Sequence, residues 1–398
     1  MLIKQAATVL NNTLNAMQWG AIDVSSVAPD LSNLVDVGKT VLDYISDQTN
    51  FDSFTKQLID QVGKVDMVDR IYRSQAPNII KDSWTYGSIL QKVRCELPAA
   101  DTNETWNLPA HTSAGTYPDP FELTPPSVSA TFFNAKTTYE VPITLTEIQV
   151  REALRSAQDY MRLISMIENR VAMKKTLCND ALIMATINNM AARKIAGTGY
   201  VDLLGLWNGA SGTDTKADVI GNPQFWRFAA LTVSKYKKYL AGASKLYNDG
   251  TYITFTPADK LKFIMPTDYA RALDTYLYSG TFHENYVKLE GFEEVGYWQG
   301  SGEDDDERTI INVDLGAFDY DGDETVGDTT VTADIFAIMF DEEAAVVCNQ
   351  NDRVTSMYNP RGEYVNYFYK WDALYMNDLK ENCVVFTIGT PTITEDES

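Results

Sequence analysis

Residue types that carry general acid–base catalysis are scarce in this 398-residue sequence. It contains two histidines, His111 and His283, and each stands apart from residues that would form a catalytic group with it. Histidine titrates near neutral pH and is the most frequent catalytic acid or base. Because His111 falls in a proline-rich stretch, we expect it to be solvated or to lie at an interface. The sequence therefore predicts a protein that is not an enzyme.

An acidic segment carries the alternating carboxylates that calcium-binding loops use. Asp319, Asp321 and Asp323 occupy alternate positions, as the oxygen ligands of such a loop do. A calcium loop also needs glycine at its sixth position and glutamate at its twelfth, where this sequence has Glu324 and Thr330. The three aspartates are candidate metal ligands, and a solvated acidic turn is the alternative interpretation.

Two glycine-containing segments match functional motifs only in part. Residues 38–40 read Gly-Lys-Thr, but Asn33 replaces the upstream glycine of a phosphate-binding loop and no strand precedes it. We interpret this segment as helix-breaking and predict no cofactor. Asn359–Gly362 is a turn signature in which proline fixes φ and glycine takes the unfavourable corner. Arg361 in that turn either binds a neighbour's carboxylate through both guanidinium nitrogens or is solvated.

Composition and charge exclude several classes of protein. With 44% hydrophobic and 22% charged residues the chain is globular, and its length suggests two or three domains. Its net charge of −22 argues against a nucleic-acid-binding surface as its main feature. The four cysteines form no CxxC pair, which indicates a reducing, cytoplasm-like compartment. No apolar window is long enough to cross a membrane, so we expect no membrane partner.

The segment 83–196 must position any functional surface, because it cannot be stable alone. Around Ile89–Leu97 and Thr131–Ile143 apolar and polar residues alternate, which predicts two half-buried strands. Pro98–Ser127 between them holds six of the fourteen prolines and is expected to be an extended tip. An isolated two-stranded ribbon is marginally stable in water, so we expect its apolar face to lie against a neighbouring subunit.

A long amphipathic helix is predicted directly after the second strand. Thr146 and Gln149 form a capping-box pattern, and the next glycine or proline is Gly197. Apolar residues recur every three or four positions through Glu147–Ala196, which is 50 residues, or roughly 75 Å if unbroken. We therefore expect a helical backbone on which other layers dock.

The remaining sequence predicts a mixture of helices and strands. Helical patterns precede the ribbon and recur after residue 198, where they alternate with strand-like segments; apolar strands close the chain. The expected helices cover residues 6–19, 31–47, 51–65, 225–240 and 268–278, and the expected strands cover 252–255, 262–265, 334–340, 344–348 and 383–388.

This order of elements resembles the HK-97-type major capsid proteins of tailed bacteriophages. The sequence LQKVRCELPAAD at Leu90–Asp101 is similar to the rising strand of that family's E-loop. Asp341–Ile388 is similar to the C-terminal region of head proteins from short-tailed phages of Gram-positive hosts. The architecture covers nearly the whole chain, whereas the local likeness is concentrated in its C-terminal part.

The resemblance implies an α+β chain with the HK-97-type capsid fold. Its five regions are an N-terminal arm with short helices at 1–82, a two-stranded E-loop at 83–145, a long spine helix of the peripheral (P) domain at 146–197, an axial (A) domain at 198–340, and C-terminal P-domain strands at 341–398. It also implies a structural virion protein that self-assembles into hexamers and pentamers of an icosahedral or prolate head. Scaffolding and portal proteins are the implied partners. The head encloses double-stranded DNA without tight binding and is assembled in the host bacterial cytoplasm.

Two features depart from the family's pattern. Its cross-linking members join an E-loop lysine to a P-domain asparagine, but the tip Pro98–Ser127 contains no lysine, so a covalent network is not implied. Some members remove a long N-terminal scaffolding segment. Here the first 75 residues carry packable helical patterns, which argues against such processing.

Expected inter-subunit contacts lie in the tip, on the second strand and in the C-terminal turn. They are Trp106, His111, Phe121, Phe133, Tyr139 and Arg361. Two alternatives remain open: an encapsulin-like nanocompartment shell, which shares the fold, and an acidic calcium- or carbohydrate-binding surface protein.

Overall fold

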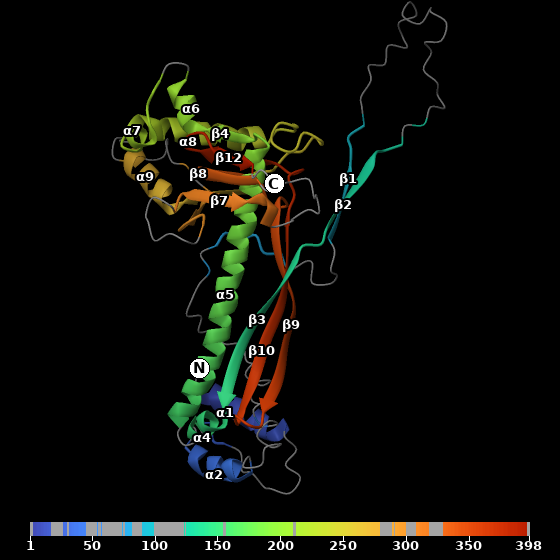
Figure 1. The fold of residues 1–398 in the computed structure, drawn as a ribbon, viewed down its shortest axis with the longest axis vertical. Coiled ribbons are helices and arrows are strands. Elements are labelled where there is room, and N and C mark those ends of the chain that lie inside the picture. The colour runs from blue at the N-terminus through green and yellow to red at the C-terminus, as the bar shows by residue number, and fades with distance from the viewer. Residues whose placement is uncertain are drawn as a thin grey trace, which may run out of the picture. The chain divides into compact units, whose positions relative to one another are not determined.

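The computed structural model describes residues 3–16, 27–29, 32–44, 54, 57, 74, 76–81, 90–98, 123, 125–153, 157–209, 212–278, 289, 291–299, 308–317 and 329–395. The chain divides into two compact units, and Figure 1 labels their elements. Unit 1 holds Met1–Ala76, Lys136–Met184 and Cys348–Leu374, and unit 2 holds Pro77–Ala135, Ala185–Val347 and Tyr375–Ser398. Helix α5 and strands β9 and β10 contribute residues to both units.

Unit 1 contains most of a three-stranded sheet in the order β3-β10-β9. Its strands are β3 (Lys136–Thr146), β9 (Ala345–Asn359) and β10 (Tyr364–Asn377). β3 and β10 are antiparallel, and Tyr139 lies opposite Trp371. Along β3 and at the start of β10 the more buried residues alternate, as in Leu145 and Val365, which matches the period-2 pattern of a half-buried sheet, whereas β10 is buried continuously from Trp371 to Asn377.

Helices complete the described part of unit 1. They are α1 (Ile3–Ala16), α2 (Leu34–Tyr44), α4 (Glu147–Ala153) and the first part of α5 (Ala157–Ala196). The interpretation of residues 38–40 as helix-breaking is wrong, because Gly38 lies inside α2. A single glycine costs a helix only about 1 kcal/mol, and the buried neighbours Val37 and Val41 hold this one in place.

The predicted capping box is formed at the start of α4. The Thr146 N–H donates to Gln149 Oε1 at 3.2 Å, and the Gln149 N–H donates to the Thr146 hydroxyl at 3.3 Å. Two donors at the helix start are thereby satisfied reciprocally. The predicted start of the helical segment at Glu147 is confirmed.

The predicted end of the long helix at Ala196 is also confirmed. Residues 154–156, between α4 and α5, lie outside the described residues. The residue that takes the left-handed conformation after α5 is Thr198, with φ of 59°, so Gly197 is not the strained position. No helix in the described ranges is long and apolar enough to span a membrane.

Unit 2 contains a sheet whose described strands number seven. Strand β8 is its hub, because it pairs antiparallel with β5, β7, β11 and β12. Its residues Ile335–Phe340 are all apolar and fully buried, as expected for a strand segment that is covered on both faces. The strands are β4 (Tyr200–Asp202), β5 (Leu261–Pro266), β6 (Glu293–Val295), β7 (Ile310–Asp314), β8 (Thr329–Asp341), β11 (Cys383–Thr387) and β12 (Thr392–Glu395).

Helices pack beside this sheet around an aromatic core. They are α6 (Leu203–Asn208), α7 (Lys216–Ile220), α8 (Pro223–Leu240), α9 (Thr267–Tyr278) and the 3-10 helix η5 (Leu315–Ala317). Trp226 of α8 is fully buried, and its ring centre lies 6.1 Å from that of Phe336 in β8. Tyr269 of α9 stacks on the same phenylalanine at 5.6 Å.

Sequence periodicity located the long helices and several strands of unit 2 but not its short elements, such as β4, α7 and β12. The helices expected at 225–240 and 268–278 are confirmed as α8 and α9, and the strand expected at 262–265 is confirmed as β5. The strand expected at 252–255 is wrong, since Thr254 makes only an isolated bridge to Ser244. The side chain of Asn248 donates to the Tyr252 carbonyl at 2.6 Å and accepts from a backbone N–H, so a polar side chain organises this loop.

The extent of the predicted strand at 131–143 is wrong. β1 (Leu90–Cys95) pairs antiparallel with β2 (Val128–Phe133), and β3 begins after a break at Asn134 and Ala135. β3 then pairs with β10 in a different sheet. One continuous alternating pattern serves two sheets, because alternation does not reveal which partner a strand takes.

The turn predicted at Asn359–Gly362 is confirmed, but glycine has a different role in it. Asn359 Oδ1 accepts from the Arg361 N–H at 3.0 Å. The positive φ of 51° falls on Glu363 and not on Gly362. A Cβ at position 362 would collide with the Tyr364 ring, so glycine is needed there for space.

Candidate functional site

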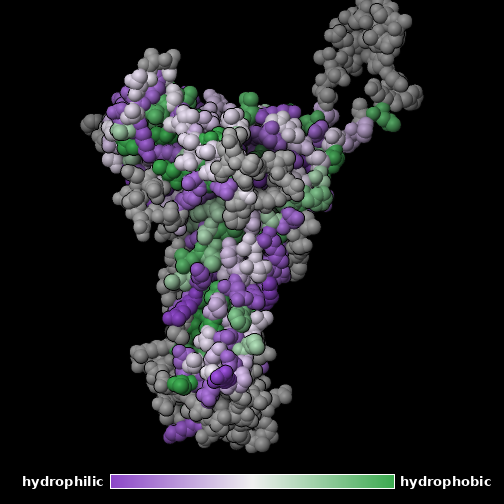
Figure 2. Space-filling model, in the orientation of Figure 1, coloured by the Kyte–Doolittle hydropathy of each residue, from purple (hydrophilic) through white to green (hydrophobic). Residues whose placement is uncertain are grey.

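The β1–β2 ribbon presents one apolar face that its own chain leaves uncovered. Val93, Leu97, Val128 and Phe132, which we call the apolar face, are 61%, 69%, 59% and 56% exposed. Figure 2 shows hydrophobic side chains at the surface of this ribbon. Val93 lies on β1 and Phe132 on β2. The pairing of the two strands places both side chains on the same face of the ribbon. Apolar side chains gathered in this way mark a contact surface.

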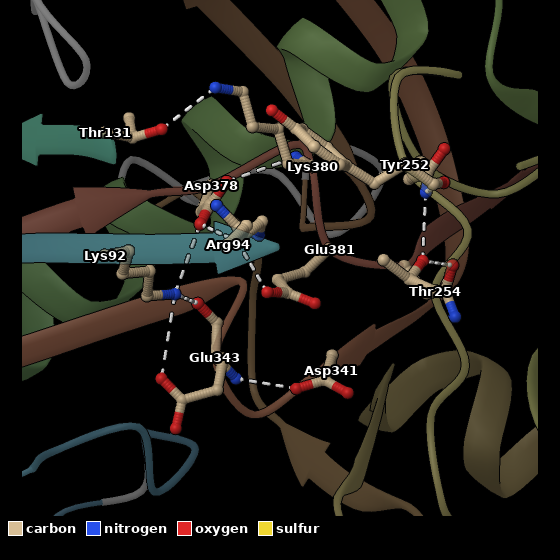
Figure 3. Close-up of polar contacts among 12 residues, drawn as sticks. Lys92, Arg94, Thr131, Tyr252, Thr254, Asp341, Glu343, Asp378, Lys380 and Glu381 are labelled. Atoms are coloured by element: carbon tan, nitrogen blue, oxygen red, sulfur yellow. Dashed lines mark hydrogen bonds and ion pairs between the residues drawn. The ribbon is translucent and has the colours of Figure 1, made fainter. Parts of the chain in front are cut away.

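The opposite face of the ribbon is charged and lies against its own chain (Figure 3). Lys92 Nζ donates to the Glu343 carbonyl at 2.6 Å and lies 3.2 Å from Asp378 Oδ2. Arg94 Nη2 donates to Asp378 Oδ2 and to Glu381 Oε1, both at 2.5 Å. The side chains of Lys92, Arg94 and Asp378 are only 14%, 13% and 2% exposed. Hydrogen bonds between shielded charges are stronger than those of surface ion pairs.

Strand β2 joins the same network through hydroxyl groups. Lys380 Nζ donates to the Thr131 hydroxyl at 2.9 Å, and the hydroxyls of Ser129 and Tyr252 are 2.5 Å apart. Thr131 and Ser129 lie directly opposite the two basic residues of β1 in the strand register. The four residues Lys92, Arg94, Ser129 and Thr131 therefore form one polar face.

Burial and charge pairing have opposite effects on the pKa values in this network. Burial alone would lower the pKa of Arg94, but Asp378 and Glu381 outweigh it and raise that pKa. Burial alone would raise the pKa of Glu343, but neighbouring lysines, chiefly Lys81, outweigh it and lower that pKa. Both shifts favour the charged forms of Arg94 and Glu343.

Apolar packing attaches the ribbon at the end formed by Leu90 and Phe133. Leu90 and Phe133 are cross-strand partners, and Phe133 is 3% exposed. Phe133 packs with Val346 and Met376, and Leu90 packs against the same cluster. The ribbon therefore has an apolar attachment at this end and ionic attachments farther along.

A second ionic network lies within unit 1, around Asp372 of β10. Its carboxylate accepts from both terminal nitrogens of Arg353 at 3.1 Å and from the Thr138 hydroxyl at 2.7 Å. Lys136 Nζ lies 3.0 Å away, and the Asp372 side chain is 4% exposed. The Arg353 guanidinium, with smaller contributions from its other donors, holds the pKa of Asp372 far below its usual range in spite of burial. This network links all three strands of the sheet.

Several of the candidate residues from the sequence lie outside the described residues. They are the tip residues Trp106, His111 and Phe121 and the candidate metal ligands Asp319, Asp321 and Asp323. Within the described ranges, no group of three or more histidine, cysteine, aspartate or glutamate side chains is arranged to hold a metal ion.

The other three predicted contacts have different surroundings. Phe133 is 3% exposed and packs with Val346 and Met376 of its own chain. Tyr139 is half-buried and stacks on Trp371 of its own chain, with ring centres 5.3 Å apart. Arg361 is exposed in the turn between β9 and β10.

Reasoning from sequence did not find the polar face as an attachment. The alternation at 89–97 places Lys92 and Arg94 opposite the apolar residues, but it does not identify their partners. Arg94 and its partner Asp378 are separated by 284 positions in the chain. The available signal was the acidic pair Asp378 and Glu381 in the loop between two apolar strands.

A family model supplies the strongest comparison. The model described as "Phi29-like phage major capsid protein" matches residues 14–387. No curated protein matches the chain.

Solved phage structures share the fold. A chain in the capsid structure of Staphylococcus phage Andhra matches with a TM-score of 0.52 and 11% identity, covering 82% of this chain and 87% of that chain. A chain in "Structure of head fiber and inner core protein gp22 of native bacteriophage P68" matches with a TM-score of 0.50 and 11% identity, covering 82% and 88%. The α+β, HK-97-type fold predicted from the sequence is confirmed, and neither alternative class is favoured.

Proposed function

Because the chain belongs to the family of Phi29-like phage major capsid proteins, we propose that the apolar face of the β1–β2 ribbon is its shell-building contact. The protein is a structural subunit of a phage head shell, it associates with copies of itself, and its place is the virion. The proposal concerns which residues make the association.

The observation that carries this proposal is the exposure of the apolar face. The exposed residues Val93, Val128 and Phe132 lie on a two-stranded ribbon, which cannot bury an apolar face by itself. When another copy covers such a face, burial of its apolar surface is favourable by about 25 cal/mol per Å². A contact between two different patches of identical chains is heterologous and closes into rings when the rotation permits.

Finer features of the assembly belong to the same proposal. The rings are hexamers and pentamers of an icosahedral or prolate head that encloses double-stranded DNA without binding it tightly. Scaffolding and portal proteins take part, and assembly occurs in the host bacterial cytoplasm. The five regions expected from the sequence serve as arm, E-loop, spine, A-domain and P-domain strands. Arg361, exposed in its turn, and the tip residues Trp106, His111 and Phe121 add contacts to the shell.

Replacement of apolar-face residues by serine tests the proposal. Val93→Ser and Phe132→Ser change exposed side chains, so the subunit should keep its fold. A few buried residues near the centre of an interface carry most of its binding energy, at about 2 kcal/mol or more each, so loss of both side chains should abolish or greatly reduce shell formation if they are among them. Electron microscopy measures shell formation, and circular dichroism with size-exclusion chromatography measures folding of the subunit.

The matched control is Gln91→Ser. Gln91 is exposed and lies opposite Phe132 in the same ribbon, but its truncation removes little apolar area. This variant should form normal shells. Normal shells from the double variant Val93→Ser/Phe132→Ser would contradict the proposed contact.

A further inference from the structure

We infer that the β1–β2 ribbon is a lever with an apolar pivot and an ionic clamp, so that its direction is adjustable. This inference rests on the proposed function, since a movable ribbon matters only if its apolar face meets another copy. It concerns the attachment of the ribbon within its own subunit, which is measured without any shell.

The pivot is the cross-strand pair Leu90 and Phe133. It shares the only apolar cluster that the described residues of the ribbon form with the rest of unit 2, through Val346 and Met376. Phe133 is 3% exposed, so detaching this end would bring a large aromatic side chain into water. This end is expected to stay attached when the rest of the ribbon moves.

The clamp lies two to four residues beyond the pivot, or about 7–13 Å along the strand. It consists of Lys92 and Arg94 on one side and Glu343, Asp378 and Glu381 on the other. The hydroxyls of β2 add neutral hydrogen bonds to the same side of the ribbon. All of these groups are ones that water also solvates well.

Opening the clamp therefore does not resemble the detachment of an ordinary core strand. The apolar face already points away from the chain, so release exposes charged and hydroxyl groups but adds little apolar surface. The hydrophobic effect, which locks most strands in place, contributes little at this position. Salt screens the more exposed members of the clamp, such as Glu343, and screens the shielded pairs much less.

An adjustable ribbon suits a subunit that meets its neighbours in more than one setting. In a closed shell the same chain must occupy slightly different environments. A lever with its apolar end fixed and its ionic part releasable changes direction while the apolar face remains presented. The clamp thus controls the direction of the ribbon, while the apolar face that makes the contact stays unchanged.

The test uses isolated full-length subunits that carry a nitroxide label on Cys95. This cysteine is exposed on β1, beyond the clamp, while Cys348 and Cys383 are buried. Cys178 is half-buried, so a Cys178→Ser background restricts the label to the ribbon. Electron paramagnetic resonance then reports the fraction of ribbons that are released and mobile.

Neutralising the clamp should release the ribbon. In Lys92→Met/Arg94→Met we expect the mobile fraction to rise at least about tenfold, since each charge-assisted hydrogen bond is worth about a factor of ten. Unmutated protein should show a smaller rise in the mobile fraction when salt is raised from about 0.1 M to about 1 M, because shielded pairs are screened less than exposed ones. The control Lys262→Met removes an ion pair to Glu293 at 3.6 Å, with side chains 25% and 43% exposed, that lies away from the ribbon; it should leave the spectrum unchanged.

Each outcome separates the clamp from the proposed shell contact. A label that is equally immobile in the double variant and in high salt would overturn the lever, whatever the shells do. Release of the ribbon in Lys92→Met/Arg94→Met would support the lever. If Val93→Ser/Phe132→Ser nevertheless builds normal shells, the proposed contact would be contradicted while the lever stands. The unmutated protein in high salt keeps the test decisive if the double variant fails to fold.

Discussion

At the scale of single residues, replacing one carboxylate oxygen of Asp372 by an amide nitrogen should have a large effect on stability. Its carboxylate is almost completely buried and compensates Arg353 and Lys136. Asp372→Asn keeps the shape but leaves Arg353 and Lys136, whose side chains are 42% and 35% exposed, without this counter-charge. Removing one partner of a fully buried ion pair costs about 3–5 kcal/mol, and the cost is smaller where the cations keep contact with water. We expect the free energy of unfolding, measured in urea, to fall by about 2 kcal/mol.

A surface ion pair of the same unit provides the control for that prediction. Asp352 pairs with Lys175 at 2.7 Å, but its side chain is 68% exposed. Asp352→Asn should change the unfolding free energy by no more than about 1 kcal/mol. Equal losses in Asp352→Asn and Asp372→Asn would mean that burial does not set the strength of the Asp372 network.

The pH dependence of the Asp372 effect follows from its depressed pKa. A carboxyl group whose pKa is lower in the folded state contributes stability above its unfolded pKa, which is about 3.9. That contribution is lost as the pH falls through the folded pKa. The difference between unmutated protein and Asp372→Asn should therefore stay constant from neutral pH to about pH 5 and shrink below about pH 4.

At the scale of elements, helix α5 should tolerate no break in its second half. Ile187 is fully buried, and position 187 lies nine residues from the nearest end of α5. Ile187→Pro removes a helical hydrogen bond and adds a steric clash, which costs about 3 kcal/mol or more. We expect loss of folded subunit, measured by recovery from size-exclusion chromatography and by circular dichroism. Ile187→Val, which costs about 0.5–1.5 kcal/mol, is the control and should remain folded.

The same element-scale logic explains why helices were easier to predict than strand partners. The start at Glu147 and the end at Ala196 follow from local sequence: a capping box, an apolar period and the first following glycine. Strand β3 continues the alternation of β2 without interruption, so its transfer to another sheet has no local signal.

At the scale of the whole molecule, net charge predicts weak binding to nucleic acid. The chain has 33 basic and 55 acidic residues, and clamp residues such as Lys92 and Arg94 already have carboxylate partners. Fewer free cations mean fewer phosphate contacts. We expect isolated subunits to bind non-specific duplex DNA no more tightly than about 10⁻⁴ M at physiological salt. A salt titration of binding measures this.

The basic residues of α8 give a matched variant for that experiment. Lys235 and Lys238 are exposed, whereas Lys237 lies over the Phe263 ring at 4.7 Å and is partly shielded. If α8 makes no phosphate contacts, Lys235→Glu/Lys238→Glu should leave DNA binding unchanged. Micromolar affinity with a steep salt slope, lost in this variant, would reveal a basic surface that the net charge conceals.

The sequence by itself determined the kinds of element, most of their positions and the two-faced character of the ribbon. These are local properties, because helical period, strand alternation and capping depend on residues a few positions apart. The order of the elements also sufficed to indicate the capsid fold, which the family match confirms.

Only the tertiary structure decided which face of the ribbon is covered. The sequence suggested that apolar residues such as Val93 would find the partner, but within the chain it is Lys92 and Arg94 that are covered. Their partners lie in the β8–β9 and β10–β11 turns, more than 200 positions away in the sequence. Pairing of charges at such separations depends on how the strands are ordered in space, and local alternation carries no information about that order.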